Sequence, residues 1–308
     1  MDAITKLQDF YNKVDLMSDP RTNNWLFVTS PIPTYSLSLF YILFSWKIGP
    51  ALMRKRQPMQ LKHSLIIYNI AMTYLNFHIF KELLLGMIEA GYSFPCQPYD
   101  QSTAAPHIRI AAGIWWYYVS KLIEFIDTLF FILRKKDSHI SFLHVYHHST
   151  MPLLWWIGTK WVPGGQSAPA ALINAFIHII MYSYYGLAAL GPAYQKYLWW
   201  KKYLTQMQLI QFCIALTVAV YSLATGCDFP QWMSWALILY MISFLILFGN
   251  FYLQAYIKRS AKRHKKSEEV VKNGTTKCEN NGKVNKTTNG VASGNHYDLR
   301  RREDKKES

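Results

Sequence analysis

The chain has 308 residues, of which 51% are hydrophobic and 16% aromatic, and its formal net charge is +15. Residues 33–257 are a series of long apolar runs and residues 258–308 are nearly all polar, a contrast that favours a polytopic membrane protein with a soluble tail. Because the basic residues flank the apolar runs or lie in the tail, the charge fits the positive-inside rule better than a nucleic-acid surface, and no nucleic-acid partner is expected.

The first 32 residues form a polar N-terminal segment. Asp and Lys residues interrupt it, so it has no continuous apolar stretch of the kind that a cleavable signal peptide contains. We therefore expect the first membrane helix to act as its own insertion signal.

Seven stretches follow, each close to the ~20 residues that a bilayer requires. They cover residues 34–53, 64–86, 110–134, 139–158, 168–190, 204–225 and 233–256. Lys and Arg cluster after the first, third, fifth and seventh stretches, whereas the alternate loops contain few of them. This bias predicts a luminal N-terminus and a cytosolic C-terminus.

The cysteines and the tail agree with that orientation. Cys96 and Cys227 fall in two loops on the predicted luminal side, where an oxidising compartment would let them pair; two free thiols are the alternative. The polar composition of residues 258–308 predicts a disordered cytosolic tail. Lys305 and Lys306 occupy the fourth and third positions from the C-terminus, the pattern of a di-lysine retrieval signal of the endoplasmic reticulum.

The third stretch carries ionisable residues inside an apolar helix. Lys121, Glu124 and Asp127 are spaced by three, so they form one stripe. A charge near the bilayer centre costs on the order of 3 kcal/mol, so a functional site is the default interpretation. A Lys121–Glu124 pair that only fixes helix packing is the alternative. That pair would leave Asp127 without a cation, and the histidines of the next stretch are its expected partners.

The fourth stretch contains His144, His147 and His148, which helical geometry predicts to share one face. Pro152 lies four residues after His148 and should kink this helix. The fifth and sixth stretches each carry a further polar face, and we expect the four faces to line one chamber. These faces contain Asn174, His178, Tyr182, Tyr185, Gln208 and Gln211.

Two chemistries use an HxxHH pattern in a membrane. A di-iron desaturase needs more imidazole ligands than the four that converge here, so this alternative ranks low. The other chemistry is acyl transfer, in which an imidazole acts as the nucleophile or as a general base near neutral pH. A seven-helix receptor and a transporter are alternatives of other classes, but neither accounts for the charged stripe facing the histidines.

The order of motifs resembles the ELO family of very-long-chain fatty acid elongases over about residues 22–258. The matching blocks are the stripe beginning at Lys121, Phe130–Lys136, Phe142–His148, Asn174–Gly186, Tyr197–Lys202 and Gln208–Phe212, together with the di-lysine end.

This resemblance implies a 3-oxoacyl-CoA synthase of the endoplasmic reticulum, which condenses a long-chain acyl-CoA with malonyl-CoA. It implies seven helices, six of them forming a barrel around an acyl tunnel, and neither a metal nor a bound cofactor. The expected partners are membrane lipids, other elongases as oligomer partners, and the reductases and dehydratase of the elongation cycle.

Roles follow for the candidate residues. We expect His147 to attack the thioester. His144 and His148 would orient or exchange protons, and Asp127 and Glu124 would lie behind these two histidines. Asn174 and His178 would stabilise an oxyanion. The remaining candidates would bind substrate, the basic ones through CoA phosphates. They are Lys121, Arg134, Tyr182, Tyr185, Lys201, Lys202, Gln208, Gln211 and Lys258.

Overall fold

The computed structural model describes residues 3–258, and the regular elements of that part are all helices, as predicted. In chain order they are α1 (Ala3–Leu16), α2 (Ile32–Leu43), η1 (Phe44–Ile48), α3 (Gly49–Met53), α4 (Lys62–Glu89), α5 (Ala105–Ile123), α6 (Phe125–Leu133), η2 (Asp137–His139), α7 (Phe142–Trp161), α8 (Ser167–Ala189), η3 (Pro192–Tyr197), α9 (Lys201–Ala224), α10 (Gln231–Tyr252) and η4 (Leu253–Lys258). Lys305 and Lys306 lie outside the described residues.

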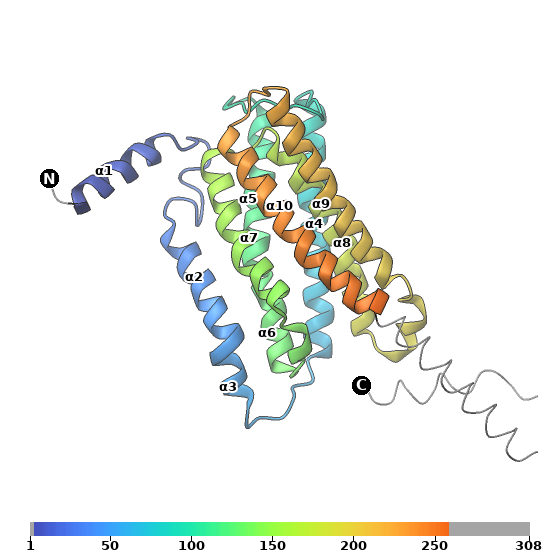
Figure 1. Ribbon diagram of the computed structural model, residues 1–308. Coiled ribbons are helices and arrows are strands. Elements are labelled where there is room, and N and C mark those ends of the chain that lie inside the picture. The colour runs from blue at the N-terminus through green and yellow to red at the C-terminus, as the bar shows by residue number, and fades with distance from the viewer. Residues whose placement is uncertain (1–2, 259–308) are drawn as a thin grey trace, which may run out of the picture. The chain divides into compact units, whose positions relative to one another are not determined.

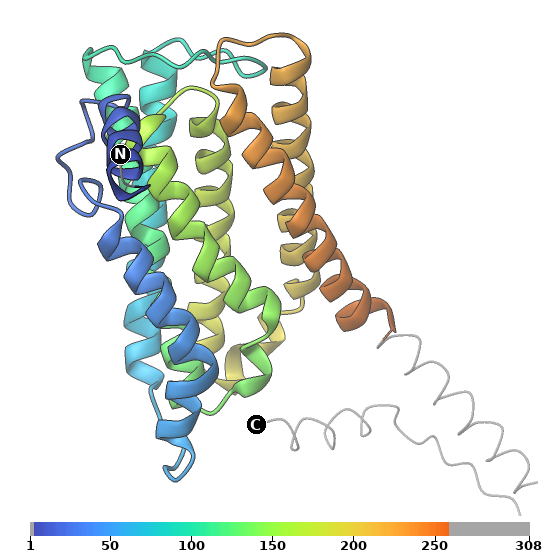
Figure 2. The ribbon, with the colours of Figure 1, turned by 60° about the vertical axis from the view of Figure 1, so that its left-hand side comes forward.

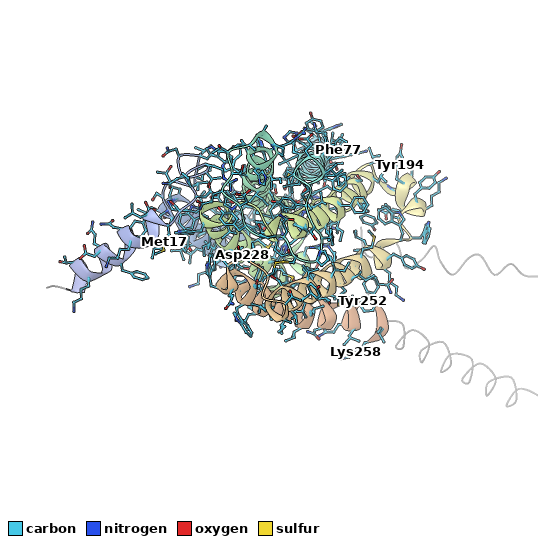
Figure 3. All side chains as sticks on the ribbon, turned by 90° about the horizontal axis from the view of Figure 1, so that it is seen from above. Met17, Phe77, Tyr194, Asp228, Tyr252 and Lys258 are labelled. Carbon is cyan, nitrogen blue, oxygen red and sulfur yellow. A yellow bond between two sulfur atoms is a disulfide. The ribbon has the colours of Figure 1, made fainter. Side chains whose placement is uncertain are left out.

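Six helices follow one another around a ring (Figure 1, Figure 2). α4 packs against α5 and α8, α5 against α7, α7 against α10, and α9 against both α10 and α8. α2 lies outside this ring against α7. Figure 3 shows the side chains of these helices from above. Two pairs of adjacent helices, α5 with α7 and α8 with α9, face each other across this ring, so they can bring their polar faces into one interior.

Four helical segments are long and apolar enough to cross a membrane: Ile32–Met53, Ser167–Ala189, Lys201–Ala224 and Gln231–Lys258. They make this chain a multi-pass membrane protein. The count of seven spans and the orientation stay predictions. The other long helices, α4, α5 and α7, carry more of the charged residues and histidines, which lowers their hydropathy.

Three elements differ from the sequence expectation or refine it. α1 was not predicted; its apolar residues Leu7, Phe10 and Val14 recur at the spacing of an amphipathic helix. The third predicted span is divided at Glu124 into α5 and α6. By contrast, α7 continues through Pro152 without a break.

The loops after α4, α7 and α9 meet at one end of the ring, which we call the disulfide end. Cys96 and Cys227 form a disulfide there. The backbone N–H of Gln97 donates to Gln166 Oε1 at 2.8 Å. Gly165 has a φ of +55°, and a Cβ at this position would meet the Phe229 ring at 3.0 Å, so only glycine fits without strain. These contacts tie the three loops together.

Lys160 fastens the N-terminal segment to the disulfide end. The sequence placed it in a loop, but it lies in the last turn of α7 with 1% of its side chain exposed. Its Nζ lies 2.7 Å from Asp15 Oδ1 and donates to Asn23 Oδ1 at 2.9 Å and to the Thr29 carbonyl at 3.3 Å. The Asp15 carboxylate thus balances the charge of Lys160, and two of the three N–H donors of its ammonium group are hydrogen-bonded.

Candidate functional site

The interior of the ring contains a charged cluster built around Glu124, whose side chain is only 1% exposed. Glu124 Oε1 accepts a hydrogen bond from Lys121 Nζ at 2.7 Å and lies 3.2 Å from His178 Nδ1 on α8. Its other oxygen lies 3.9 Å from His148 Nδ1 on α7. At the break between α5 and α6, one carboxylate therefore lies close to two histidines from different helices and to Lys121 of α5.

Asn174 extends this cluster toward α9. Its Oδ1 accepts hydrogen bonds from Tyr117 Oη at 2.7 Å and from Lys121 Nζ at 3.2 Å. Its Nδ2 faces Gln211 Oε1 at 3.4 Å. The predicted residues Lys121, Glu124, Asn174, His178 and Gln211 thus belong to one network, in which polar faces of α5, α8 and α9 meet.

The three histidines of α7 do not all point the same way. His144 and His148 are about 40° apart around a helix of 3.6 residues per turn, and their rings lie 4.3 Å apart, whereas His147 is turned about 100° from His148. His147 faces α10, with its ring 5.3 Å from that of Phe244. It is half-buried, and its ring nitrogens form no hydrogen bond with residues 3–258.

His144 and His148 have different surroundings. His144 Nε2 lies 2.7 Å from Thr128 Oγ1, which also contacts Tyr41 Oη on α2 at 2.8 Å. His148 is buried, and its Nδ1 has no hydrogen-bond partner in the described part of the chain. His148 therefore keeps unused hydrogen-bonding capacity beside Glu124.

Asp127 corrects one expectation. The α7 histidines were its predicted partners, but Asp127 Oδ2 accepts a hydrogen bond from Tyr182 Oη on α8 at 2.9 Å. Three residues beyond Glu124 on the helical path, Asp127 is turned away from α7 toward α8. Glu124 has the position beside the histidines that the sequence assigned to Asp127.

The other candidates lie away from the cluster. Tyr185 is exposed, and Gln208 Nε2 lies 3.8 Å from the sulfur of Met181. Lys201 and Lys202 are exposed at the start of α9, and Arg134 is half-buried at the end of α6. Lys258 is the last described residue and the last residue of η4.

Sequence analysis missed two tyrosines that complete the site. Tyr117 precedes Lys121 by four residues, so the stripe extends one turn further than predicted, and its ring lies 4.5 Å from Lys121 Nζ. Tyr41 reaches the site through Thr128 from a helix outside the ring. Helical spacing could have revealed Tyr117, but nothing in the sequence connects Tyr41 with Thr128.

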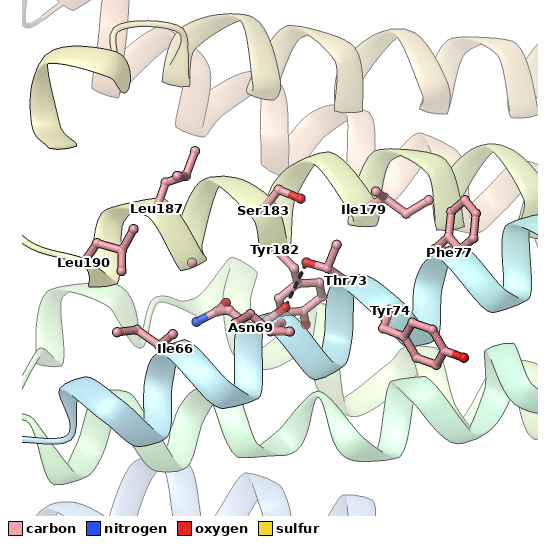
Figure 4. Close-up of a pocket in the computed structure, with 12 residues that line it drawn as sticks. Ile66, Asn69, Thr73, Tyr74, Phe77, Ile179, Tyr182, Ser183, Leu187 and Leu190 are labelled. Carbon is pink, nitrogen blue, oxygen red and sulfur yellow. Dashed lines mark hydrogen bonds between the residues drawn. The ribbon is translucent and has the colours of Figure 1, made fainter.

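A groove of about 600 Å³ lies between α4 and α8 (Figure 4). Apolar side chains line most of it, and exposed residues such as Ile70 and Tyr74 place it on the outer surface of the ring. Tyr182 lines this groove with its ring and contacts Asp127 with its hydroxyl group. The groove is therefore separate from the Glu124 cluster, with Tyr182 between them.

Known proteins resemble this chain along nearly its whole length. The family model described as "ELO: GNS1/SUR4 family" matches residues 26–264. Very long chain fatty acid elongase 4 of Homo sapiens is 50% identical over 301 residues, which cover 95% of this chain and 94% of the relative. Very long chain fatty acid elongase 5 of Tachysurus fulvidraco is 46% identical, covering 80% and 83%.

Very long chain fatty acid elongase 7 of Drosophila melanogaster is 42% identical over 306 residues, covering 96% of this chain and 91% of the relative. None of these relatives is a receptor, a transporter or a desaturase. The motif resemblance is confirmed, and the chain belongs to the ELO family of very-long-chain fatty acid elongases.

Proposed function

We propose that this chain catalyses the condensation step of fatty acid elongation, in which a long-chain acyl-CoA and malonyl-CoA give a 3-oxoacyl-CoA, CO2 and CoA. The observation that carries the proposal is the Glu124 cluster, where one carboxylate, one ammonium group and two imidazoles meet. The ring of His147 lies beside it and forms no hydrogen bond with residues 3–258. Such a cluster suits proton transfer and charge stabilisation in acyl transfer. Family membership supplies the substrate class.

The reaction takes two steps with one covalent intermediate. In the first, a ring nitrogen of His147 attacks the thioester carbonyl, the C–S bond breaks, and the departing CoA thiolate takes up the proton that the imidazole loses. In the second, malonyl-CoA loses CO2, and the resulting enolate carbon attacks the acyl-imidazole. The C–N bond then breaks, and the imidazole recovers a proton that is ultimately supplied by solvent.

The neighbouring groups orient this chemistry. His178 Nδ1 lies 3.2 Å from Glu124 Oε1 and accepts a hydrogen bond from Lys121 Nζ at 3.4 Å, because an ammonium group can only donate. The neutral ring therefore carries its proton on Nε2, which can donate to an oxyanion. His144 and His148 exchange protons with the reacting groups, and Lys121 balances the charge of Glu124. Asp127 acts through Tyr182 and touches no reacting atom.

Substrate is held in two regions. The acyl chain lies in a tunnel within the ring, where Tyr182, Gln208 and Gln211 contribute to the wall, and the substrates include polyunsaturated chains. The phosphates of CoA are attracted by basic residues, namely Arg134, Lys201, Lys202 and Lys258. Tyr185 contacts the substrate between the acyl tunnel and these basic residues.

The protein resides in the endoplasmic reticulum with its N-terminus in the lumen, seven spans and a cytosolic tail. The Cys96–Cys227 disulfide supports a luminal disulfide end, because such bonds persist in oxidising compartments. Its partners are other elongases and the two reductases and the dehydratase that process the 3-oxoacyl product.

The test uses membranes that contain the wild type or the His147→Ala variant, supplied with labelled malonyl-CoA and a panel of saturated and polyunsaturated acyl-CoAs. We expect label in 3-oxoacyl products from the wild type alone, and an acyl adduct on the wild type that the variant lacks. Full activity in His147→Ala would overturn the acyl-imidazole step. A folded wild type without activity on any acyl-CoA would overturn the condensation itself, and iron analysis would follow.

A further inference from the structure

The amide orientation of Asn174 is determined by its neighbours. An ammonium group can only donate hydrogen bonds, so the Asn174 atom 3.2 Å from Lys121 Nζ is its oxygen. Tyr117 Oη donates to the same oxygen at 2.7 Å. Both lone pairs of the carbonyl oxygen are thereby occupied, and a flipped amide would set two N–H groups against the Lys121 ammonium group.

The opposite side of this amide therefore presents N–H groups to the interior. One faces Gln211 Oε1 across 3.4 Å, a long hydrogen bond, and the other has no partner among residues 3–258. Gln211 in turn directs its oxygen to Asn174, so its own Nε2 is also without a hydrogen-bond partner in that part of the chain. Asn174 and Gln211 are each less than 10% exposed, and both lie on helices that face the ring interior.

Tyr117 is itself rigidly held. Only 1% of its surface is exposed, its ring packs edge-to-face on Trp155 with centroids 4.4 Å apart, and Lys121 Nζ lies 4.5 Å above that ring. Its hydroxyl group has Asn174 as its only hydrogen-bond partner among the described residues. Tyr117 thus delivers one hydrogen bond to one atom.

We propose that Tyr117 is a positioning residue that holds the Asn174 amide with its N–H groups toward the oxyanion formed when the thioester is attacked. This inference rests on the proposed condensation. Developing charge on a carbonyl oxygen is stabilised by donors that are already oriented before the reaction. A flipped Asn174 would present its own oxygen to that charge and raise the barrier.

The first test is Tyr117→Phe, with Tyr118→Phe as the matched control. Tyr118 lies on the same helix, is fully buried, and hydrogen-bonds to Thr34, away from the site. Tyr117→Phe should lower kcat about 10-fold and leave KM for acyl-CoA within about twofold, because one of two orienting bonds is lost and substrate binding is not. Tyr118→Phe should lower thermal stability about as much as Tyr117→Phe does, but it should leave kcat unchanged.

The second test separates the amide N–H from the amide oxygen. Asn174→Asp keeps an oxygen for Tyr117 and Lys121 but removes the donor, so kcat should fall about 100-fold. If Tyr117 acts through Asn174, Tyr117→Phe should cause no further loss in the Asn174→Asp background. The same 10-fold loss in both backgrounds would overturn the inference.

Two outcomes distinguish a failure of this inference from a failure of the proposed condensation activity. A wild type that condenses acyl-CoA while Tyr117→Phe matches Tyr118→Phe in kcat and KM would overturn the positioning role and leave the proposed function intact. A folded wild type that does not condense any acyl-CoA would overturn both.

Discussion

Lys121 and Lys160 are both almost completely buried, yet they occupy very different surroundings. Lys160 forms an ion pair with Asp15 and donates hydrogen bonds to Asn23 and the Thr29 carbonyl at the disulfide end. Lys121 shares Glu124 with His178 and His148, and the Nδ1 of His148 has no hydrogen-bond partner among residues 3–258. What distinguishes the two sites is therefore the chemistry of their partners. The Lys121 cluster contains a carboxylate and two imidazoles, whereas Lys160 meets a carboxylate, an amide and a backbone carbonyl.

Among the variants that test this comparison, Glu124→Gln should cause the largest loss of kcat. The amide cannot balance the charge of Lys121 or stabilise a proton on His178, so kcat should fall by about 100- to 1000-fold. Transfer of label from malonyl-CoA measures this loss. Asp15→Asn makes the same kind of change at Lys160 and should alter kcat by no more than about twofold. Equal losses in the two variants would remove the distinction between the lysines.

Lys160→Met should lower stability and leave kcat nearly unchanged, the reverse of what we expect for Glu124→Gln. It leaves Asp15, Asn23 and the Thr29 carbonyl without their cation, and because Asp15 stays 36% exposed, we expect the free energy of unfolding to fall by about 1–3 kcal/mol. Thermal denaturation in detergent measures the change. The kcat of the folded variant should stay near the wild-type value. A folded Lys160→Met protein without condensation activity would mean that the disulfide end takes part in the reaction.

Asp127→Asn should have the smallest effect. Tyr182 can donate its hydrogen bond to an amide oxygen as well as to a carboxylate, so kcat should fall only about threefold. Steady-state kinetics with acyl-CoA check this value. A loss as large as that of Glu124→Gln would show that Asp127 supports the histidines, as the sequence suggested. Tyr182→Phe is the companion variant, because it removes the same hydrogen bond from the other side.

Much of the site could be predicted from periodicity. Lys121 and Glu124 recur at helical spacing in an apolar stretch, and Asn174 and His178 do the same in another. Charged and amide groups in a membrane helix must face the protein interior, so these residues were expected to meet before any contact was known. The motif order also identified the family, which the comparisons confirm.

The choice of partners could not be predicted in that way. Spacing shows which residues share a helix face, but not which neighbouring helix that face meets. Glu124 rather than Asp127 lies beside the histidines because α5 ends at Ile123 and α6 begins at Phe125. Tyr41 comes from a helix outside the ring, and its contact with Thr128 depends wholly on how α2 packs.

The sequence by itself determined the helical class, the membrane character and most members of the polar network, because hydrophobic periodicity and the cost of buried charge are local properties. Only the tertiary structure decided that Glu124 is the centre, that His147 faces α10 apart from its two neighbours, and that Lys160 is buried. Each of these depends on packing between helices far apart in the chain, where the angle of a helix about its axis selects the partner.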